Sequence, residues 1–272
     1  YYITTDDQLI LSSEVGVFEL PPKKIVKKDR LRPGRMLLVD TVKGELIDDA
    51  DLKEKYASRQ PYGEWLNSNL VTLAELHIPN HKVPGYTDEE RARMQKAFGY
   101  TYESLRDAIL PMAKNGGEGT SAMGIDTPLA ALATDHQPLF NYFKQLFAQV
   151  TNPPIDSIRE KVVTSTTVYI GEDGNLLEEK AINCQVLKVN NPILTNTDLM
   201  KIKNMKVDGF KVEVIPTTYY KSTSLEKAIE RLFVEADRAY REGANILILS
   251  DRGVDEYHVP IPSLLAVSAL QQ

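Results

Sequence analysis

The sequence predicts an α/β protein in which a parallel β/α region follows a small β-rich segment. Two observations predict this class. Short β-prone runs separated by polar turns fill residues 1–47, and the final third alternates between strand-like and helix-like segments. A strand, a helix, a buried strand and a second helix in that order are typical of a parallel sheet or barrel.

The β-rich segment begins with two predicted strands in residues 1–20, on either side of the turn TTDD. A second hairpin is predicted over Arg35–Ile47, with its turn at Lys43 and Gly44. DADLKEKYASR predicts a short polar helix, and QPYGEW is expected to end it. Residues 67–85 include two prolines and show little periodicity, so we expect a linker there.

Two helices are predicted in the middle of the chain. The first begins at a capping box formed by Thr87 and Glu90 and ends at Gly99. The second lies in TYESLRDAILPMAKNGG, where Pro111 should bend or shorten its end. Its apolar residues share one face: Leu105, Ile109 and Met112.

A further helix is predicted to begin at Pro138 and to stop at TNPP. Its apolar residues form one broad face: Leu139, Phe140, Phe143, Phe147 and Val150.

The final third predicts a strand at Phe210–Tyr219 and the clearest helix of the chain, which starts at a Thr223–Glu226 capping box and ends at Gly243. The helix has an apolar face at helical spacing: Leu225, Ala228, Ile229, Leu232, Phe233, Ala236, Ala239 and Tyr240. NILILSD (Asn245–Asp251) predicts a strand buried on both faces, and IPSLLAVSAL starts a last helix.

Composition excludes several classes of protein. The net charge of −6 disfavours a nucleic-acid partner, and the basic run Pro21–Arg35 is interpreted as a solvated connector. No apolar run has the length of a membrane span, so we expect no membrane partner. Cys184 is the one cysteine, and alone it can hold neither a zinc ion nor an iron–sulfur cluster. Cys184 lies in the strand-like run AINCQVLKV, where we expect it to behave as a small hydrophobe and not as a nucleophile.

The glycine-rich stretch NGGEGTSAMGIDTPLA (residues 115–130) is the most unusual local sequence. Gly117 to Ala122 match G-x-G-x-x-A by letter, but a dinucleotide-binding loop follows a strand, and this segment follows a predicted helix. No lysine completes a P-loop. The stretch is interpreted as a loop whose glycines allow positive φ and close backbone approach, with a nucleotide-binding module as the alternative.

Two other groups of residues are candidate sites. His77 and His81 are four apart, but Pro79 lies between them, so we expect two exposed loop histidines. Asp251 and Arg252 follow the predicted buried strand at its carboxyl end, where ligands gather in α/β proteins. They leave open a free-standing α/β enzyme that uses both residues, and otherwise they cap a helix or pair across a domain interface.

Three stretches together resemble the central domain of glutamate synthase: GTSAMGIDTPLAAL, NYFKQLFAQVTNPPIDSIREKVV and ILILSDRGVDEYHVPIPSLLAVSAL. YYITTDDQLILSSEVGVFEL, LRPGRMLLVDT and QPYGEWL resemble the end of that family's glutaminase domain. The resemblance implies that residues 1–70 complete a glutaminase (type II amidotransferase) domain with a linker, and that residues 71–272 form a central domain related to an incomplete (β/α) barrel.

The resemblance also implies what this chain lacks. The family's nucleophilic cysteine would lie upstream and its FMN and iron–sulfur sites downstream, so we expect no catalytic, cofactor-binding or metal-binding residue here. The expected partners are the glutaminase and FMN domains of a longer cytoplasmic chain, with a small reductase subunit or ferredoxin as electron donor.

The resemblance assigns a role to the glycine-rich stretch. In this family, ammonia passes through an internal tunnel from the glutaminase site to the FMN site, and the central domain lines part of it. The positions that match the family's tunnel constriction are Met123 and Thr151, and the further candidates for the tunnel wall or for contacts between domains are Gly119, Thr120, Ser121 and Asn152.

Overall fold

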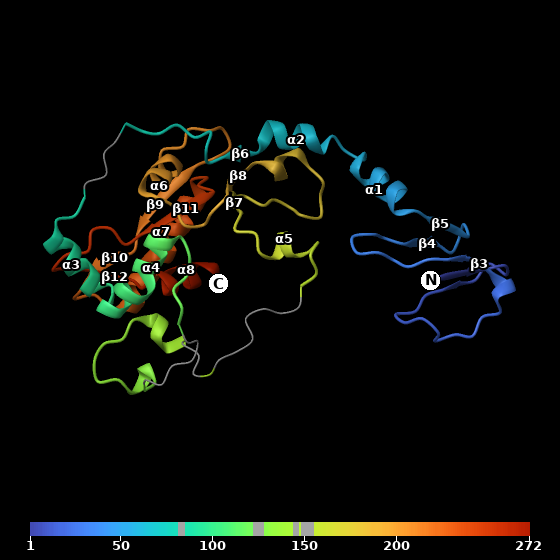
Figure 1. Cartoon of the computed structure of the whole chain (residues 1–272). Helices are drawn as coiled ribbons and strands as arrows, with labels where there is room; N and C mark the ends of the chain where they lie inside the picture. Colours follow the sequence, from blue (N-terminus) through green and yellow to red (C-terminus); the bar gives the residue numbers. More distant parts are fainter. Residues whose placement is uncertain (81–84, 122–127, 144–146, 148–154) are drawn as a thin grey trace. The chain divides into compact units, whose positions relative to one another are not determined.

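The computed structural model describes residues 1–80, 85–121, 128–143, 147 and 155–272. The chain divides into two compact units, which are described separately (Figure 1). The first unit comprises Tyr1–Leu70, Ile155–Ser165 and Glu179–Cys184. The second comprises Val71–Pro154, Thr166–Glu178 and Gln185–Gln272.

A three-stranded antiparallel sheet opens the first unit. Its strands are β1 (Tyr2–Thr4), β2 (Leu9–Ile10) and β3 (Ile25–Lys28), in the order β2-β1-β3. The predicted hairpin around TTDD is confirmed, with Asp7 at φ 58° in its turn. The prediction of a connector over the basic run is wrong in part. After a 3-10 helix at Pro22–Lys24, Ile25 packs half-buried and β3 forms a sheet edge that leaves its lysines in solvent.

The second predicted hairpin is confirmed as β4 (Leu38–Asp40) and β5 (Glu45–Ile47), with Gly44 at φ +68° in the turn. The predicted polar helix is α1 (Asp49–Ala57). The expectation that QPYGEW only ends this helix is wrong, because Pro61 starts a second helix, α2 (Tyr62–Asn69). A proline at a helix start loses no hydrogen bond.

Later segments of the chain complete the first unit. They contribute α5 (Glu160–Val163) and a 3-10 helix at Ala181–Cys184, which contacts α2. Tyr62 Oη donates a 2.8 Å hydrogen bond to Glu179, across 117 positions of sequence. The prediction that Cys184 lies in a strand is wrong. Cys184 is the last residue of the 3-10 helix, and the strand begins two residues later, at Val186.

In the second unit, a three-stranded sheet joins β6 (Val71–Thr72), β8 (Val186–Val189) and β7 (Val168–Gly171), in the order β6-β8-β7. β6 runs parallel to β8, and β7 runs antiparallel to it. The linker predicted over residues 67–85 is wrong at its start, because α2 extends to Asn69, β6 follows, and Leu76 is buried.

The strand–helix–strand order predicted for the final third is confirmed. β9 (Val212–Pro216) and β11 (Ile246–Ser250) pair in parallel, and α7 (Leu225–Arg241) connects them. Two antiparallel strands, β10 (Thr218–Tyr220) and β12 (His258–Pro260), and the predicted final helix α8 (Ser263–Gln271) complete this part. β11 is not buried on both faces as predicted, since Leu247 is 37% exposed.

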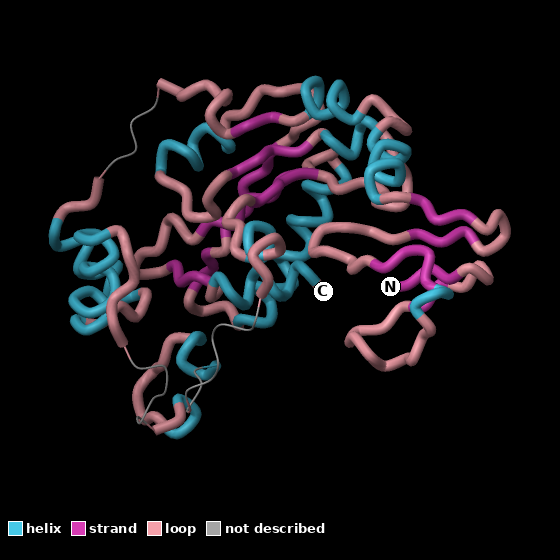
Figure 2. Tube along the Cα trace, turned by 45° about the vertical axis from the view of Figure 1, so that its right-hand side comes forward, coloured by secondary structure: helices cyan, strands magenta, loops and turns pink. Residues whose placement is uncertain are grey.

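The architecture is therefore mixed α/β with small sheets (Figure 2). None of these sheets closes into a barrel within the part of the chain that the structure describes. β7 is antiparallel to β8, so this sheet is mixed where a parallel region was predicted.

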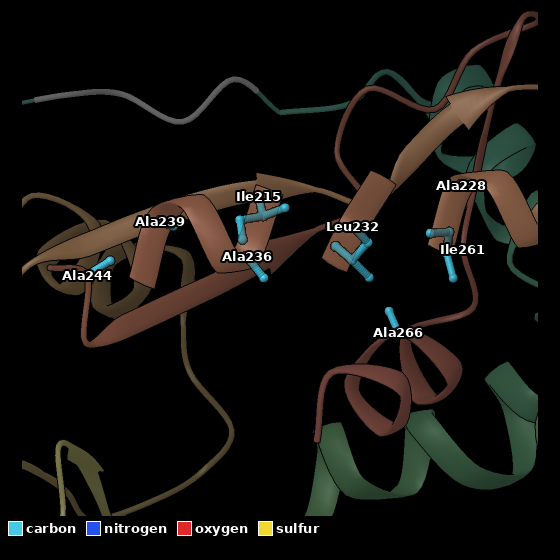
Figure 3. Close-up of a cluster of buried hydrophobic side chains, with 8 residues drawn as sticks. All are labelled: Ile215, Ala228, Leu232, Ala236, Ala239, Ala244, Ile261 and Ala266. Carbon is cyan, nitrogen blue, oxygen red and sulfur yellow. The ribbon is translucent and has the colours of Figure 1, made fainter. Parts of the chain in front are cut away.

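The apolar face of α7 forms the main core with β9 and α8 (Figure 3). Leu232 is completely buried and lies with Ala266 and Ile261 at the centre of this cluster. The predicted face was too broad, because Phe233 is 43% and Tyr240 74% exposed. The remaining members of the cluster are small or branched: Ile215, Ala228, Ala236, Ala239 and Ala244.

The predicted ends of α7 are nearly correct. Ser224, one residue after the predicted Thr223, caps the helix by accepting a hydrogen bond from the Lys227 N–H. Gly243 follows the helix at φ +90°, as a carboxyl-terminal glycine should.

A second core joins β8, β11 and α6 (Asn196–Lys203). Leu187 and Val189 of β8 are fully buried there with Ile202 of α6 and Ile246 of β11.

Helix α3 (Asp88–Ala97) confirms the predicted capping box, since Thr87 and Glu90 exchange both hydrogen bonds and Gly99 follows at φ +74°. The helix predicted from Pro138 is, in its described part, a 3-10 helix at Leu139–Phe143, with two exposed phenylalanines. Another 3-10 helix covers Ala130–Leu132. Val150 lies outside the described residues.

Candidate functional site

The glycine-rich stretch starts at the carboxyl end of α4 (Leu110–Asn115). Gly116 is left-handed at φ +63° and donates its N–H to the Met112 carbonyl at 3.0 Å. This is the geometry of a helix C-cap. A helix carboxyl end carries partial negative charge, so this turn does not form the anion-binding start that a nucleotide loop needs.

Gly119 packs against the preceding helical turn. A Cβ atom at this position would lie 2.7 Å from the Asp107 carbonyl oxygen and 3.4 Å from the Pro111 side chain. The turn itself is a π-helix over Ser104–Ile109, in which Leu110 N–H bonds to the Leu105 carbonyl. Pro111 has no N–H and cannot continue an α-helical ladder, which explains the wider winding.

Three of the six predicted tunnel residues are described. Gly119 is half-buried against its own helix, whereas Thr120 and Ser121 are exposed. Met123, Thr151 and Asn152 lie outside the described residues, so the structure does not place them beside the other three.

Asp251 and Arg252 do lie at the carboxyl end of β11, as predicted. Arg252 donates a 2.9 Å hydrogen bond to the Asn196 side chain at the start of α6. Its backbone N–H contacts Ser250 Oγ at 3.3 Å. Arg252 therefore holds the turn against α6 through a hydrogen bond. This is neither the helix cap nor the pairing across a domain interface that the sequence left open, because Thr195 caps α6 and both residues belong to the second unit.

The other polar clusters support the fold. His77 is exposed, and His81 lies outside the described residues. Asp255 accepts N–H bonds from Tyr257 and His258 and contacts the His258 ring at 2.9 Å, which together lower the pKa of its carboxyl group. Within the described ranges, no three His, Cys, Asp or Glu side chains are grouped to hold a metal ion.

A cavity of about 470 Å³ lies in the second unit, at the carboxyl ends of the parallel strands β6 and β8. Leu73, Asn190 and the first turns of α6 line it, together with Lys188 and Lys201. The strand-like run AINCQVLKV predicted β8, whereas α6 was not predicted. A signal for α6 is present in the sequence, since Thr195 with Asp198 forms a capping box.

Comparison with known families gives the identity of the chain. The family profile "Glutamate synthase central domain" matches residues 93–272, well over half of the chain. The chain belongs to the glutamate synthase family. The profile "Glutamine amidotransferases class-II" matches residues 1–65 of this glutamate synthase family member.

Curated glutamate synthases align along the whole chain. The Bacillus subtilis (strain 168) "Glutamate synthase [NADPH] large chain" is 42% identical over all of this chain and 18% of its own length. The Schizosaccharomyces pombe "Glutamate synthase [NADH]" is 42% identical over 99% of this chain and 13% of its own. A Synechocystis "Ferredoxin-dependent glutamate synthase 2" is 39% identical over 99% of this chain and 18% of its own length. The chain thus spans less than a fifth of these relatives.

None of the described helices combines the length and the apolar character that a membrane crossing requires.

Proposed function

We propose that this chain is the part of a glutamate synthase that connects the glutaminase domain to the FMN domain. The observation that carries this is the tandem match, with an amidotransferase segment at 1–65 and the central domain at 93–272 in one chain. The parent enzyme would convert glutamine, 2-oxoglutarate and reductant into two molecules of glutamate. This chain would then contribute structure and ammonia transfer, and no catalytic residue.

Residues 1–70 are proposed to end the glutaminase domain and residues 71–272 to form the central domain. The change from the first compact unit to the second at Leu70 and Val71 supports this boundary. For the central domain, an incomplete (β/α) barrel relationship is proposed. Two parallel strand pairs support it, because β9, α7 and β11 form one β/α/β unit and β6 lies parallel to β8.

The proposed tunnel wall includes Thr120 and Ser121, followed by Met123, with Thr151 and Asn152 from the later segment. This tunnel wall is supported by the packing of Gly119 onto its own helix, which leaves the small side chains of Thr120 and Ser121 exposed. Small side chains let backbone atoms approach a passage wide enough only for ammonia.

The cofactors and partners of the parent enzyme are proposed to lie outside this chain. An iron–sulfur cluster needs several cysteine ligands, and Cys184 is the single cysteine, so the residues present do not fit it. The glycine segment at a helix carboxyl end does not fit the FMN phosphate either. The proposed partners are the flanking domains in the cytoplasm and a reductase subunit or ferredoxin. The names of the relatives differ in this donor, which is NADPH, NADH or ferredoxin.

A chimera tests this function. This chain replaces the matching segment of the Bacillus subtilis large chain, to which it is 42% identical. The chimera should make glutamate from glutamine. Thr120→Trp should then reduce synthesis from glutamine, while glutaminase activity and synthesis from added ammonia stay within about twofold, because only transfer between the sites is blocked.

Thr223→Trp is the matched control, since Thr223 is also an exposed loop threonine of the second unit and does not cap α7. All three rates of the control should match those of the chimera. If Thr120→Trp lowers the three rates together, or lowers none, then Thr120 does not line the path of ammonia. A folded chimera without glutamine-dependent synthesis would contradict the proposed place of the chain.

A further inference from the structure

The cavity at the ends of β6 and β8 has the position and size of a ligand site. Ligands of α/β proteins bind outside the carboxyl ends of parallel strands. β6 ends at Thr72 and β8 at Val189, and both residues line the cavity. Its volume of about 470 Å³ lies within the range of small-molecule pockets.

The charged groups of the cavity favour an anion. Lys188 and Lys201 are both half-buried and face one carboxylate, Asp198. That carboxylate is engaged elsewhere, because it accepts hydrogen bonds from Thr195 Oγ1 at 2.6 Å and Thr195 N at 3.2 Å. These bonds, and to a smaller extent the charge of Lys201, lower the pKa of Asp198 and keep it ionised in its capping role. The three ionisable side chains therefore sum to one positive charge.

The two ammonium groups have donors to spare. Lys201 Nζ donates to the Leu73 carbonyl at 3.4 Å, which is a long bond and uses one of three N–H groups. The Lys188 ammonium forms no ion pair or hydrogen bond with the residues that the structure describes, although the Lys188 carbonyl accepts the Leu73 N–H in the sheet. A partly desolvated ammonium is stabilised by an anionic partner.

The rest of the wall combines apolar and polar groups. Leu73, Ala74, Ile193 and Leu194 supply hydrocarbon surface, and Thr72, Asn190 and Asn191 add a hydroxyl and two amides. Such a wall suits an uncharged body attached to the anionic group, because the body removes apolar surface from water.

We propose that this cavity binds a small organic anion, whose carboxylate or phosphate contacts Lys188 and Lys201 and whose apolar body covers Leu73 and Ile193. Both anionic groups share the oxyanion chemistry that lysine recognises. The site is separate from the glycine-rich segment and does not depend on the proposed ammonia path.

Calorimetric titration of the 272-residue chain at low salt tests the site. Adenosine monophosphate is the phosphate probe and N-acetylphenylalanine the carboxylate probe. Adenosine and N-acetylphenylalanine amide are the matched neutral probes. At least one anionic probe should bind with a Kd below about 1 mM, and its neutral partner at least tenfold more weakly. The better anionic probe identifies the preferred group.

Lys188→Gln and Lys201→Gln should each raise the Kd of that probe roughly tenfold or more, since each removes a charge-assisted hydrogen bond. Lys203→Gln is the control, because Lys203 is exposed on the same helix and does not line the cavity. The Kd of Lys203→Gln for the same probe should stay within about twofold of that of the unchanged chain. The circular dichroism spectra of all three variants should match that of the unchanged chain.

Three results would overturn the proposal: no binding of either anionic probe, equal binding of the anionic and neutral probes, or equal Kd in both cavity-lysine variants and the unchanged chain. If a variant is unfolded, the comparison of anionic with neutral probes on the unchanged chain decides.

Discussion

The Asp49 carboxylate holds the start of α1 against the loop before it. It accepts the Met36 N–H at 2.9 Å and the Arg35 guanidinium at 2.6 Å, and Lys53 lies 3.0 Å away. Its side chain is only 5% exposed. These contacts, with the Met36 bond first, lower the pKa of Asp49 from 3.8 to about 2.

Asp49 should therefore give the first unit an acid-sensitive stability. A carboxyl group whose pKa is lower in the folded chain stabilises the fold above pH ~3.8, and the effect is lost as the pH falls to about 2. Asp49→Asn should melt earlier at pH 7 and show a shallower loss of stability between pH 4 and 2. Fluorescence of Trp65, the one tryptophan, reports on this unit.

The control for that measurement is Asp51→Asn, an exposed carboxylate in the same first turn of α1. It should leave the slope of stability against pH close to that of the unchanged chain. Parallel acid profiles for Asp49→Asn and the unchanged chain would show that Asp49 does not contribute to this pH dependence.

Gly119 should be intolerant of any side chain. Because a Cβ atom would lie 2.7 Å from the Asp107 carbonyl oxygen, Gly119→Ala forces the backbone to shift. We expect a loss of roughly 1–3 kcal/mol, as for other overpacked sites, in urea unfolding followed by circular dichroism. Gly117→Ala is the matched control, with nothing within 4 Å of the added methyl group. Equal stability of the two variants would mean that the close approach is not maintained in solution.

At the scale of elements, the packing of α7 depends on a narrow buried stripe formed by Ala228, Leu232, Ala236 and Ala239. Leu232 is 0% exposed within the cluster of β9, α7 and α8. Leu232→Ala should cost roughly 2–5 kcal/mol in urea unfolding, from lost burial and the cavity left behind. Val234→Ala, on the 69% exposed side of the same helix, should change stability by less than about 0.5 kcal/mol. A loss below that value for Leu232→Ala would contradict the packing.

Elements with local signals could be predicted from the sequence. The capping box at Thr87, the turn glycine Gly44 and the periodicity of α7 all act within a few residues of their effect. Pairing of β6 with β8 could not be predicted in this way, because Val71 meets Leu187 across more than a hundred positions. β6 has only two paired residues, too few for a periodic pattern.

The candidate site was predictable only in part for a similar reason. The sequence indicates that glycine is needed near residue 119. The contact of Gly119 with the Asp107 carbonyl depends on the π-helix that precedes Pro111, and the sequence does not predict this π-helix. The position of Asp251 and Arg252 at a strand end was predicted correctly, whereas Asn196, the partner of Arg252, lies on α6, a helix that was not predicted. The two lysines of the cavity come from different elements, Lys188 from β8 and Lys201 from α6. Neither lysine is unusual in its local sequence, so the sequence does not indicate that they share a site.

At the scale of the whole molecule, each folded unit is built from segments that are not continuous in sequence. The sequence predicts one domain boundary, near residue 70, and this boundary stays a prediction. The first compact unit also takes in Ile155–Ser165 and Glu179–Cys184. Composition and periodicity do not reveal such returns, because each returning segment is short and has ordinary polarity.

This interleaving has a consequence for the time at which the first unit can form during synthesis. Glu179 bonds to Tyr62 and pairs with Arg59, so α2 gains these partners only after the ribosome has added more than a hundred further residues. At roughly 5–20 residues per second, the delay is on the order of ten seconds. During that interval the nascent amino-terminal unit is incomplete, and chaperones that recognise unfinished surfaces have time to bind it.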